Sequence, residues 1–433
     1  MHRSQRMGLA DAAWLALERP QNHAVVTGVL QLTGRLDVDV LRELMRTRLV
    51  EAYPRLAQRA SAASWPRLPG WHDDPDLDLT RHVVQEPAGP QGGYDDEELQ
   101  LLAGALVSRP LDPERPPWQI HLVRQRGGGT ALVARFHHGL ADGVALATVL
   151  LRLTDPAPGS GTGADPLPRR LQPSSADVRR VAAAVRAAVA VVPTLARLVV
   201  TAGEPPTLLR GRLGPAKSLA WTRPHDLGEV RDVARALDVS INDVLLAATA
   251  GGLRRHLNER GGPVADLRVI VPVDLRAGVP VPAGLGNRFG IVIARLPVGE
   301  PDPLRRVRRV AGVTRRLKGS TEAGATFGLL RLVGALPGPL QEVAVAVLGA
   351  SASAVVTNVP GPREPLVVGG CPLRAVVFWA PQVGRIGLGI SLFSYAGTIT
   401  VGVATDVLLG IDAPDLARAI EDEITTLRAA ANG

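Results

Sequence analysis

Apolar residues follow helical or strand spacing in two long stretches of the chain. In the first stretch, residues 37–49 (DVDVLRELMRTRL) place apolar side chains at helical intervals, which predicts a helix. Residues 118–123 and 130–136 have the composition of strands, and residues 144–153 (VALATVLLRL) return to a helical pattern. Two histidines, His137 and His138, therefore lie in the turn between a predicted strand and a predicted helix.

The second stretch begins near residue 217 and is richer in strands. Residues 238–257 predict a helix, which Ser240 and the pair Asn242–Asp243 are suited to cap. Strand-like runs then follow at residues 267–273, 289–296, 353–359, 373–380, 387–395 and 398–406. So many strands predict a sizeable sheet with flanking helices, and hence an α/β fold.

The middle of the chain, residues 154–216, is less regular than these two stretches. Residues 154–175 are rich in Pro, Gly and Ser and are typical of a surface linker. Residues 176–201 form an Ala- and Val-rich helical stretch interrupted at Pro193, which is either a buried connecting helix or a helix at a membrane interface. We therefore predict an N-terminal domain at 1–153, a linker with a connecting helix at 154–216, and a C-terminal domain at 217–433.

Composition narrows the function classes. The chain has 433 residues, of which 46% are hydrophobic and 21% are charged, so it can bury a core without metal or disulfide support. Its one cysteine excludes an intramolecular disulfide and a cysteine zinc cluster, and indicates a reducing compartment. The net charge of +8 suits a solvated surface, a phosphate-bearing substrate or an anionic membrane. Only 3% of residues are aromatic, which argues against nucleic acid as a partner.

Residues 137–143 (HHGLADG) hold the candidate chemistry. A neutral imidazole near pH 7 can accept a proton from a hydroxyl or a thiol if its orientation is fixed, and a carboxylate such as Asp142 can fix a turn. A metal site would need a third ligand and helical spacing, and the chain has no GxSxG motif for a serine nucleophile. Taken by themselves, the two histidines are better explained as structural residues that fill a turn.

The HHxxxDG pattern does not stand alone. It is the signature of the CoA-dependent acyltransferase superfamily, and several further segments resemble one branch, the bacterial wax ester synthase/acyl-CoA:diacylglycerol acyltransferase family. These segments include LADAAWLALERPQN, SRPLDPERPPWQIHLV, SINDVLLAATAGGLRRHL, GNRFGIVIARL and TNVPGP. They follow the family order from residue 9 to residue 362, so the resemblance covers most of the chain.

The resemblance implies two chloramphenicol-acetyltransferase-like domains, each a mixed β-sheet with flanking helices, with an active-site tunnel at their interface. It makes His138 the general base, gives His137 a role in supporting the turn, and makes Asp142 the anchor of the loop through an arginine. Arg59 is our candidate for that arginine. Gly143 is expected to let a substrate approach the backbone.

Other matched residues have two interpretations. Asn242 either caps its helix or, as the resemblance implies, donates to the thioester oxygen or orients His138. Asn287–Arg288 and residues 358–362 form turns that the resemblance brings to the domain interface. We expect Trp118 and His121 to be buried packing residues, and the apolar residues 327–336 and 340–348 either to face the lipid substrate or to pack in the core.

The implied reaction transfers a long-chain acyl group from acyl-CoA to diacylglycerol or to a fatty alcohol, without a metal or another cofactor. Because the products are insoluble, we expect a cytoplasmic protein that attaches peripherally to a membrane or a lipid droplet. We find neither a signal peptide nor a membrane-spanning segment. Two alternatives remain: acylation of a specialised-metabolite hydroxyl or use of a carrier-protein thioester on the same fold, and a lipid-binding protein without turnover.

Overall fold

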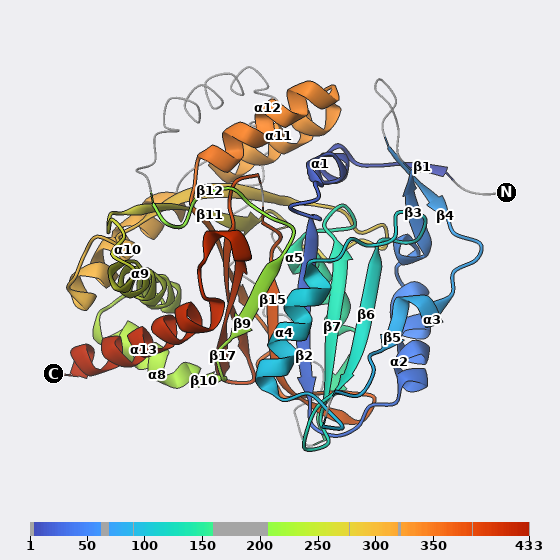
Figure 1. The fold of residues 1–433 in the computed structure, drawn as a ribbon, viewed down its shortest axis with the longest axis horizontal. Helices are drawn as coiled ribbons and strands as arrows, with labels where there is room; N and C mark the ends of the chain where they lie inside the picture. Colours follow the sequence, from blue (N-terminus) through green and yellow to red (C-terminus); the bar gives the residue numbers. More distant parts are fainter. Residues whose placement is uncertain are drawn as a thin grey trace.

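Two seven-stranded mixed sheets form the centre of the molecule (Figure 1). The computed structural model describes residues 4–61, 69–89, 91–158, 207–276, 278–318, 322–382 and 384–432. The predicted helix at 176–201 and most of the predicted linker lie outside these residues.

The first sheet has the strand order β5-β6-β7-β2-β15-β14-β8. Its neighbouring strands are antiparallel except for the parallel pair β5 and β6. The strands are β2 (Val25–Leu32), β5 (Val83–Gln85), β6 (Trp118–Arg124), β7 (Thr130–His137), β8 (Thr154–Pro156), β14 (Leu366–Val368) and β15 (Cys371–Trp379).

The second sheet has the order β10-β17-β16-β13-β11-β12, and β9 also pairs with β17. Strands β11, β13 and β16 are parallel to one another, and the outer strands are antiparallel to their neighbours. The strands are β9 (Lys217–Trp221), β10 (His225–Asp226), β11 (Leu267–Asp274), β12 (Phe289–Leu296), β13 (Ala354–Pro360), β16 (Leu388–Tyr395) and β17 (Thr398–Asp406). A small third sheet joins β1 (Ser4–Arg6), β4 (Gly70–Asp73) and β3 (Gln58–Ser61).

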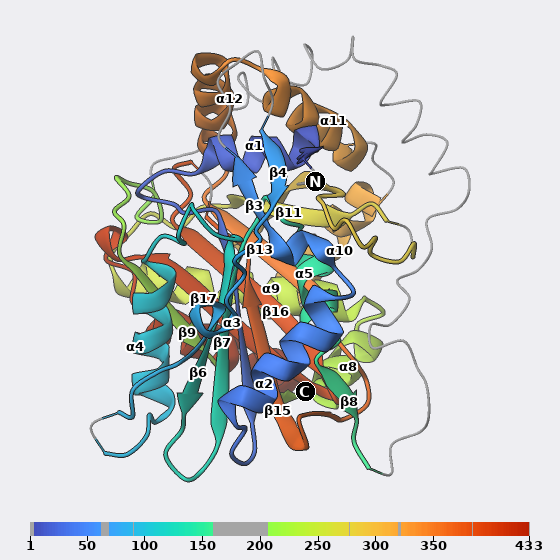
Figure 2. The same cartoon turned by 90° about the vertical axis from the view of Figure 1, so that its right-hand side faces the viewer.

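Helices cover the sheets (Figures 1 and 2). Beside the first sheet lie α1 (Leu9–Leu17), α2 (Val38–Leu44), α3 (Leu79–His82), α4 (Asp96–Val107) and α5 (Gly143–Leu151). Beside the second lie α8 (Leu227–Ala236), α9 (Ile241–Glu259), α10 (Pro303–Lys318), α11 (Glu322–Ala335), α12 (Gly338–Ala350) and α13 (Ala413–Asn432). Helices α11 and α12 stand over α1 at one end of the molecule (Figure 2).

Late segments of the chain complete the first sheet. Strands β14 and β15 come from residues predicted to belong to the C-terminal domain, and β15 pairs with the central strand β2. Residues 154–156, which we predicted to begin a linker, form strand β8 and pair with β14. That part of the linker prediction is wrong, because the pairing with β14 supplies order that the local sequence does not indicate. The range 217–433 therefore contributes strands to both sheets.

The predicted elements are largely confirmed. The strands predicted at 289–296 and 398–406 match β12 and β17, and the helix predicted at 37–49 forms α2 followed by a π-helical turn at Met45–Val50. The α/β fold class is confirmed by the two mixed sheets and their helices. In the described part of the chain, no single helix has the length and apolar character to cross a membrane, although the bent pair α8 and α9 meets these criteria together.

Candidate active site

The turn after β7 holds His138 in the wall of a pocket. Strand β7 ends at His137, and α5 begins at Gly143 with Asp142 as its N-cap, whose carboxylate accepts a hydrogen bond from the Ala145 N–H at 3.0 Å. The His138 N–H donates to the Ala24 carbonyl at 2.7 Å, which ties the turn to the start of β2. The strand and the capped helix thus fix both sides of this histidine.

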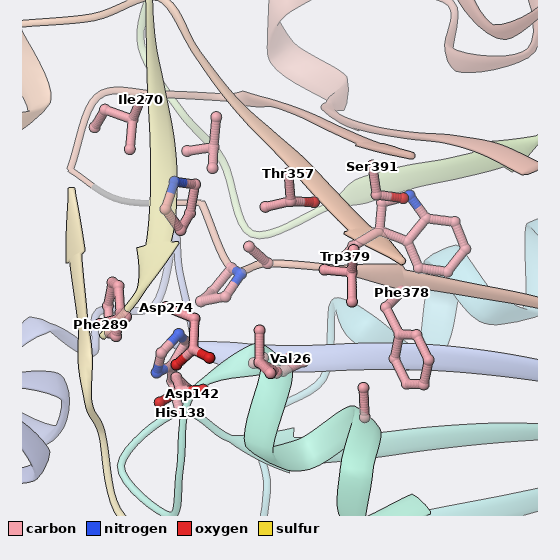
Figure 3. Close-up of a pocket in the computed structure, with 18 of the residues that line it drawn as sticks. Val26, His138, Asp142, Ile270, Asp274, Phe289, Thr357, Phe378, Trp379 and Ser391 are labelled. Atoms are coloured by element: carbon pink, nitrogen blue, oxygen red, sulfur yellow. The ribbon is translucent and has the colours of Figure 1, made fainter. Parts of the chain in front are cut away.

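The pocket lies between the two sheets and spans about 1100 Å³, part of which is open to solvent. Its wall is mostly apolar and includes Val26 of the first sheet, Ile270 and Phe393 of the second, and Leu330 of α11. Figure 3 shows His138, Asp142 and Asp274 on one side of the pocket and Phe378, Trp379 and Ser391 on the other. The pocket thus places an imidazole beside a wall of the apolar kind that binds apolar ligands.

Aromatic rings enclose the His138 imidazole. The Trp14 indole stacks on it at 3.8 Å between ring centroids, and Phe289 is tilted against it at 5.5 Å. Among the described residues the Nδ1 atom of His138 has no hydrogen-bond partner. Burial lowers the pKa of His138 to about 4, although the Asp142 charge opposes the shift, so the imidazole is neutral near pH 7.

His137 supports the turn rather than facing the pocket. Its Nδ1 atom accepts a hydrogen bond from the Gly139 N–H at 2.9 Å, and its Nε2 atom lies 3.6 Å from the Glu18 carboxylate. A side chain on Gly139 would crowd this contact, because its Cβ would lie 2.9 Å from the same Nδ1 atom. This geometry agrees with the predicted supporting role of His137.

Asp142 anchors the turn through a buried ion pair with Arg276. One Arg276 nitrogen donates to Asp142 Oδ1 at 2.9 Å and a second donates to Oδ2. Burial would raise the pKa of Asp142, but the Arg276 charge together with hydrogen bonds from Arg276, Arg288 and Ala145 holds that pKa below its ordinary value. The candidate Arg59 is wrong: it lies in β3 opposite His72, because residues 58–61 pair with β4. The arginine that pairs with Asp142 is instead Arg276, which comes just after β11, and β11 ends beside the turn.

Residues 286–288 of the second half hold the same turn from the other side. The Gly286 N–H donates to the Leu140 carbonyl at 2.9 Å, and the Arg288 N–H donates to Asp142 at 2.9 Å. Between them, the Asn287 amide donates to the His138 carbonyl at 2.8 Å. The predicted pair Asn287–Arg288 therefore lies at the interface and fixes the backbone of His138.

Asp11 of α1 completes this arrangement. Its Oδ1 atom accepts hydrogen bonds from the N–H and the side-chain amide of Asn287, both at 2.8 Å. Burial raises the pKa of Asp11 to about 6, while the Asn287 hydrogen bonds and the Arg55 charge lower it. Because Trp14 lies in the same helix, α1 contacts the His138 ring directly and its backbone through Asn287.

Gly143 and Asn242 differ in their relation to the pocket. Gly143 lines it, and a Cβ at this position would have no atom within 4 Å, so the missing side chain leaves room for a substrate. Asn242 is not among the lining residues; its amide oxygen accepts a hydrogen bond from Asn358, which does line the pocket. Ser240 and Asp243 form the capping box of α9, so capping belongs to them and not to Asn242.

Trp118 and His121 are buried, as predicted. The Trp118 indole donates to the Leu56 carbonyl at 2.7 Å, and His121 lies 2.7 Å from Glu86. Sequence reasoning missed Trp14, Asp11, Phe289 and Arg276. Asp11 did give a signal, because it is a charge within an otherwise apolar helix.

Comparison with known proteins identifies the family. The model of the wax ester synthase/diacylglycerol acyltransferase catalytic domain matches residues 7–245, and the C-terminal domain model of the same family matches residues 285–428. The chain belongs to this family. It is therefore an acyltransferase, and the fold and family predicted from the sequence are confirmed.

A curated relative agrees with this assignment, and solved structures share the fold. The Mycobacterium tuberculosis protein named "Probable diacylglycerol O-acyltransferase tgs1" is 33% identical over 382 residues, which cover 83% of this chain and 81% of that protein. The fold is similar to that of the wax ester synthase/diacylglycerol acyltransferase from Marinobacter aquaeolei VT8, with a TM-score of 0.72 and 21% identity over 99% of this chain and 100% of the other. The first condensation domain of the CDA synthetase has a TM-score of 0.64 and 20% identity, over 99% and 96% of the two chains.

Proposed function

We propose that this acyltransferase moves a long-chain acyl group from acyl-CoA to the hydroxyl of diacylglycerol, which yields triacylglycerol. The observation that carries the proposal is a neutral, ring-enclosed His138 in the wall of an apolar pocket between the two sheets. The name of the M. tuberculosis relative supports diacylglycerol as the acceptor.

His138 acts as the general base in a ternary complex. It removes the proton of the acceptor hydroxyl while that oxygen attacks the thioester carbonyl. The tetrahedral intermediate then expels the CoA thiolate, which takes the proton from the imidazolium. No acyl-enzyme forms, and no metal or other cofactor takes part. In the described part of the chain, no three His, Cys, Asp or Glu side chains gather as a metal site would need.

The environment of His138 shapes both proton transfers. A pKa of about 4 makes the imidazole a weak base but makes the imidazolium a strong acid toward the leaving thiolate. General-base catalysis contributes roughly 10²–10⁴-fold to the rate of such reactions. Fixed positioning between Trp14 and the Asn287-held backbone supplies a further part of the rate enhancement.

A fatty alcohol is the second acceptor to consider, because the family description names wax ester synthesis beside diacylglycerol acylation. Both acceptors present a primary hydroxyl on a long apolar body, which the pocket wall suits. We further propose that the enzyme is cytoplasmic and attaches peripherally to a membrane or lipid-droplet surface, where such substrates gather.

The test is product analysis by mass spectrometry after incubation with palmitoyl-CoA and either dipalmitoylglycerol or hexadecanol. His138→Gln is expected to lower ester formation by roughly 10²–10⁴-fold. His256→Gln, a buried histidine of α9 that does not line the pocket, is the matched control and should retain activity. Unchanged ester formation by His138→Gln would refute the base assignment. An inactive parent enzyme would refute both acceptors and favour a different hydroxyl acceptor or acyl donor on the same fold.

A further inference from the structure

Several polar side chains in the pocket wall have partners within the protein. Asp142 and Asp274 both pair with Arg276, and the Asn358 amide donates to Asn242. Beside the reacting imidazole, the Trp14 Nε1 and His138 Nδ1 atoms have none among the described residues. On the opposite side of the pocket, two more polar atoms also lack a hydrogen-bond partner among the described residues. The proposed chemistry does not use these two atoms.

These two atoms are the indole Nε1 of Trp379 and the hydroxyl Oγ of Ser391. Each residue is only 3% exposed, and neither atom has a hydrogen-bond partner in the described part of the chain. Burial of an unpaired polar atom costs free energy of folding, because the hydrogen bond to water is lost and not replaced. A pair of such atoms in the wall of a substrate pocket therefore indicates a partner that arrives with the substrate.

The two atoms converge over Gly402. Trp379 comes from β15 of the first sheet, Ser391 comes from β16 of the second, and Gly402 of β17 lies opposite Ser391 in the antiparallel register. A Cβ on Gly402 would lie 2.6 Å from the Ser391 hydroxyl and 2.8 Å from the Trp379 nitrogen. Figure 3 shows the hydroxyl beside the indole nitrogen. The same Cβ would lie 2.5 Å from a Val377 methyl group, so only glycine lets the two polar atoms come this close together.

The chemistry of the pair selects its ligand. An indole N–H only donates, whereas a serine hydroxyl can donate or accept. Two donors side by side suit a single carbonyl oxygen, which has two lone pairs. The neighbouring wall residues Phe378, Leu392 and Phe393 are apolar, so a neutral carbonyl is favoured over a carboxylate, whose desolvation would be more costly.

We propose that Trp379 and Ser391 form a subsite that holds a carbonyl oxygen of a substrate while the reacting group lies at His138. The inference rests on the proposed function, which offers two sources of such an oxygen. One is an ester carbonyl of the diacylglycerol acceptor. The other is an amide carbonyl of the pantetheine arm of acyl-CoA. A fatty alcohol offers no carbonyl, and this difference makes the sources separable.

The experiment compares Trp379→Phe and Ser391→Ala with the parent enzyme, using palmitoyl-CoA with dipalmitoylglycerol or with hexadecanol. A loss of roughly three- to tenfold in kcat/KM per variant is expected, since each loses one neutral hydrogen bond. If the loss occurs with dipalmitoylglycerol and not with hexadecanol, the oxygen belongs to the acceptor. An equal loss with both acceptors and a raised KM for palmitoyl-CoA assigns the oxygen to the donor.

Thr27→Val is the matched control. Thr27 lies opposite Trp379 on β2, its hydroxyl is also buried and unpaired within the described chain, and it does not line the pocket. This variant should retain full kcat/KM with every substrate. Ser391→Ala should also unfold at the same or a higher urea concentration than the parent, because an unpaired buried hydroxyl is removed. Unchanged kcat/KM in both pocket variants overturns the subsite, whereas the His138→Gln result decides the proposed function separately.

Discussion

His138 depends on residues that are far away in the sequence. Trp14 stacks on its ring, and Asn287 holds its backbone carbonyl through an amide that also donates to Asp11. These contacts fix the imidazole although, among the described residues, no carboxylate is hydrogen-bonded to the ring. The Asp142 carboxylate instead accepts hydrogen bonds from Arg276 and from backbone N–H groups.

Asp11 provides a test of this arrangement through pH. Its pKa is about 6 in the folded protein against an ordinary value of 3.8. The folded state therefore binds the proton more tightly, and the resulting stability is present below about pH 4 and is lost as the pH rises through 6. Asp11→Asn keeps an acceptor oxygen for Asn287 but has no such loss. The free energy of unfolding of the variant minus that of the parent should therefore increase as the pH rises from about 4 to about 6. Above that pH the difference should stay constant.

Urea unfolding of both proteins at several pH values measures this difference. The effect of His138, whose low pKa makes the folded state less stable as the pH falls from 6.5 toward about 4, is the same in both proteins and cancels. Asp76→Asn, at an exposed position, is the control. A difference between parent and Asp11→Asn that does not change with pH would contradict the buried carboxyl group.

The sequence could predict the reactive residue but not its surroundings. The HHGLADG turn indicated His138, and the supporting contact of His137 follows from a local hydrogen bond within three residues. The arginine that pairs with Asp142 is 134 positions away. Nothing in the local pattern around Arg59 or Arg276 distinguishes them, because only the pairing of the strands brings one of them to the turn.

At the level of elements, the turn at 137–143 is held by the end of β11 and by residues 286–288. Arg276 is the central contact, since it pairs with Asp142 and Asp274 and also donates to the Gly286 carbonyl at 3.0 Å. Arg276→Gln leaves the buried carboxylate of Asp142 without its cation. We expect the free energy of unfolding to fall by about 3–5 kcal/mol, as measured by urea denaturation.

Arg428→Gln is the control for this prediction, because Arg428 pairs with Glu229 at the surface, where 52% and 38% of the two side chains are exposed. It should change the stability far less. Equal stabilities of the Arg276 and Arg428 variants would show that the buried ion pair does not anchor the turn.

The sequence analysis missed several elements, among them the amphipathic helices α8, α10 and α13 and the strand β2. Strand β2 is buried along its whole length, so it shows no alternation, and Gly28 weakens its strand signal. That glycine is required by packing, because a Cβ there would lie 2.4 Å from the Phe378 ring. Strand β8 was missed because its order comes from pairing with β14, which is more than 200 residues away.

Apolar side chains are exposed at the end of the molecule that α11 and α12 form. Leu330 of α11 lines the pocket, whereas Leu340 and Val343 of α12 are 53% and 60% exposed. The predicted lipid-facing segments thus include both a pocket residue and surface residues. Helices α11 and α12 lie together at this end of the molecule (Figure 2), so one pair of helices carries both the pocket residue and the exposed residues.

Vesicle flotation tests the surface. The protein should float with vesicles of phosphatidylcholine and phosphatidylglycerol, and the double variant Leu340→Ser/Val343→Ser should float less, because less apolar area enters the lipid. The control is Val407→Ser/Leu408→Ser, which removes two equally exposed apolar side chains elsewhere. The same loss of flotation in both double variants would argue against a specific role for α12.

The pairing of β15 with β2 also affects how the enzyme is made. Until Cys371–Trp379 has left the ribosome, one edge of β2, with the sequence VVTGVLQL, has no neighbour. Such an apolar edge readily pairs with other nascent chains. Synthesis of this protein therefore includes a long interval in which that edge is unpaired, and we expect fragments that stop before residue 371 to accumulate as aggregates.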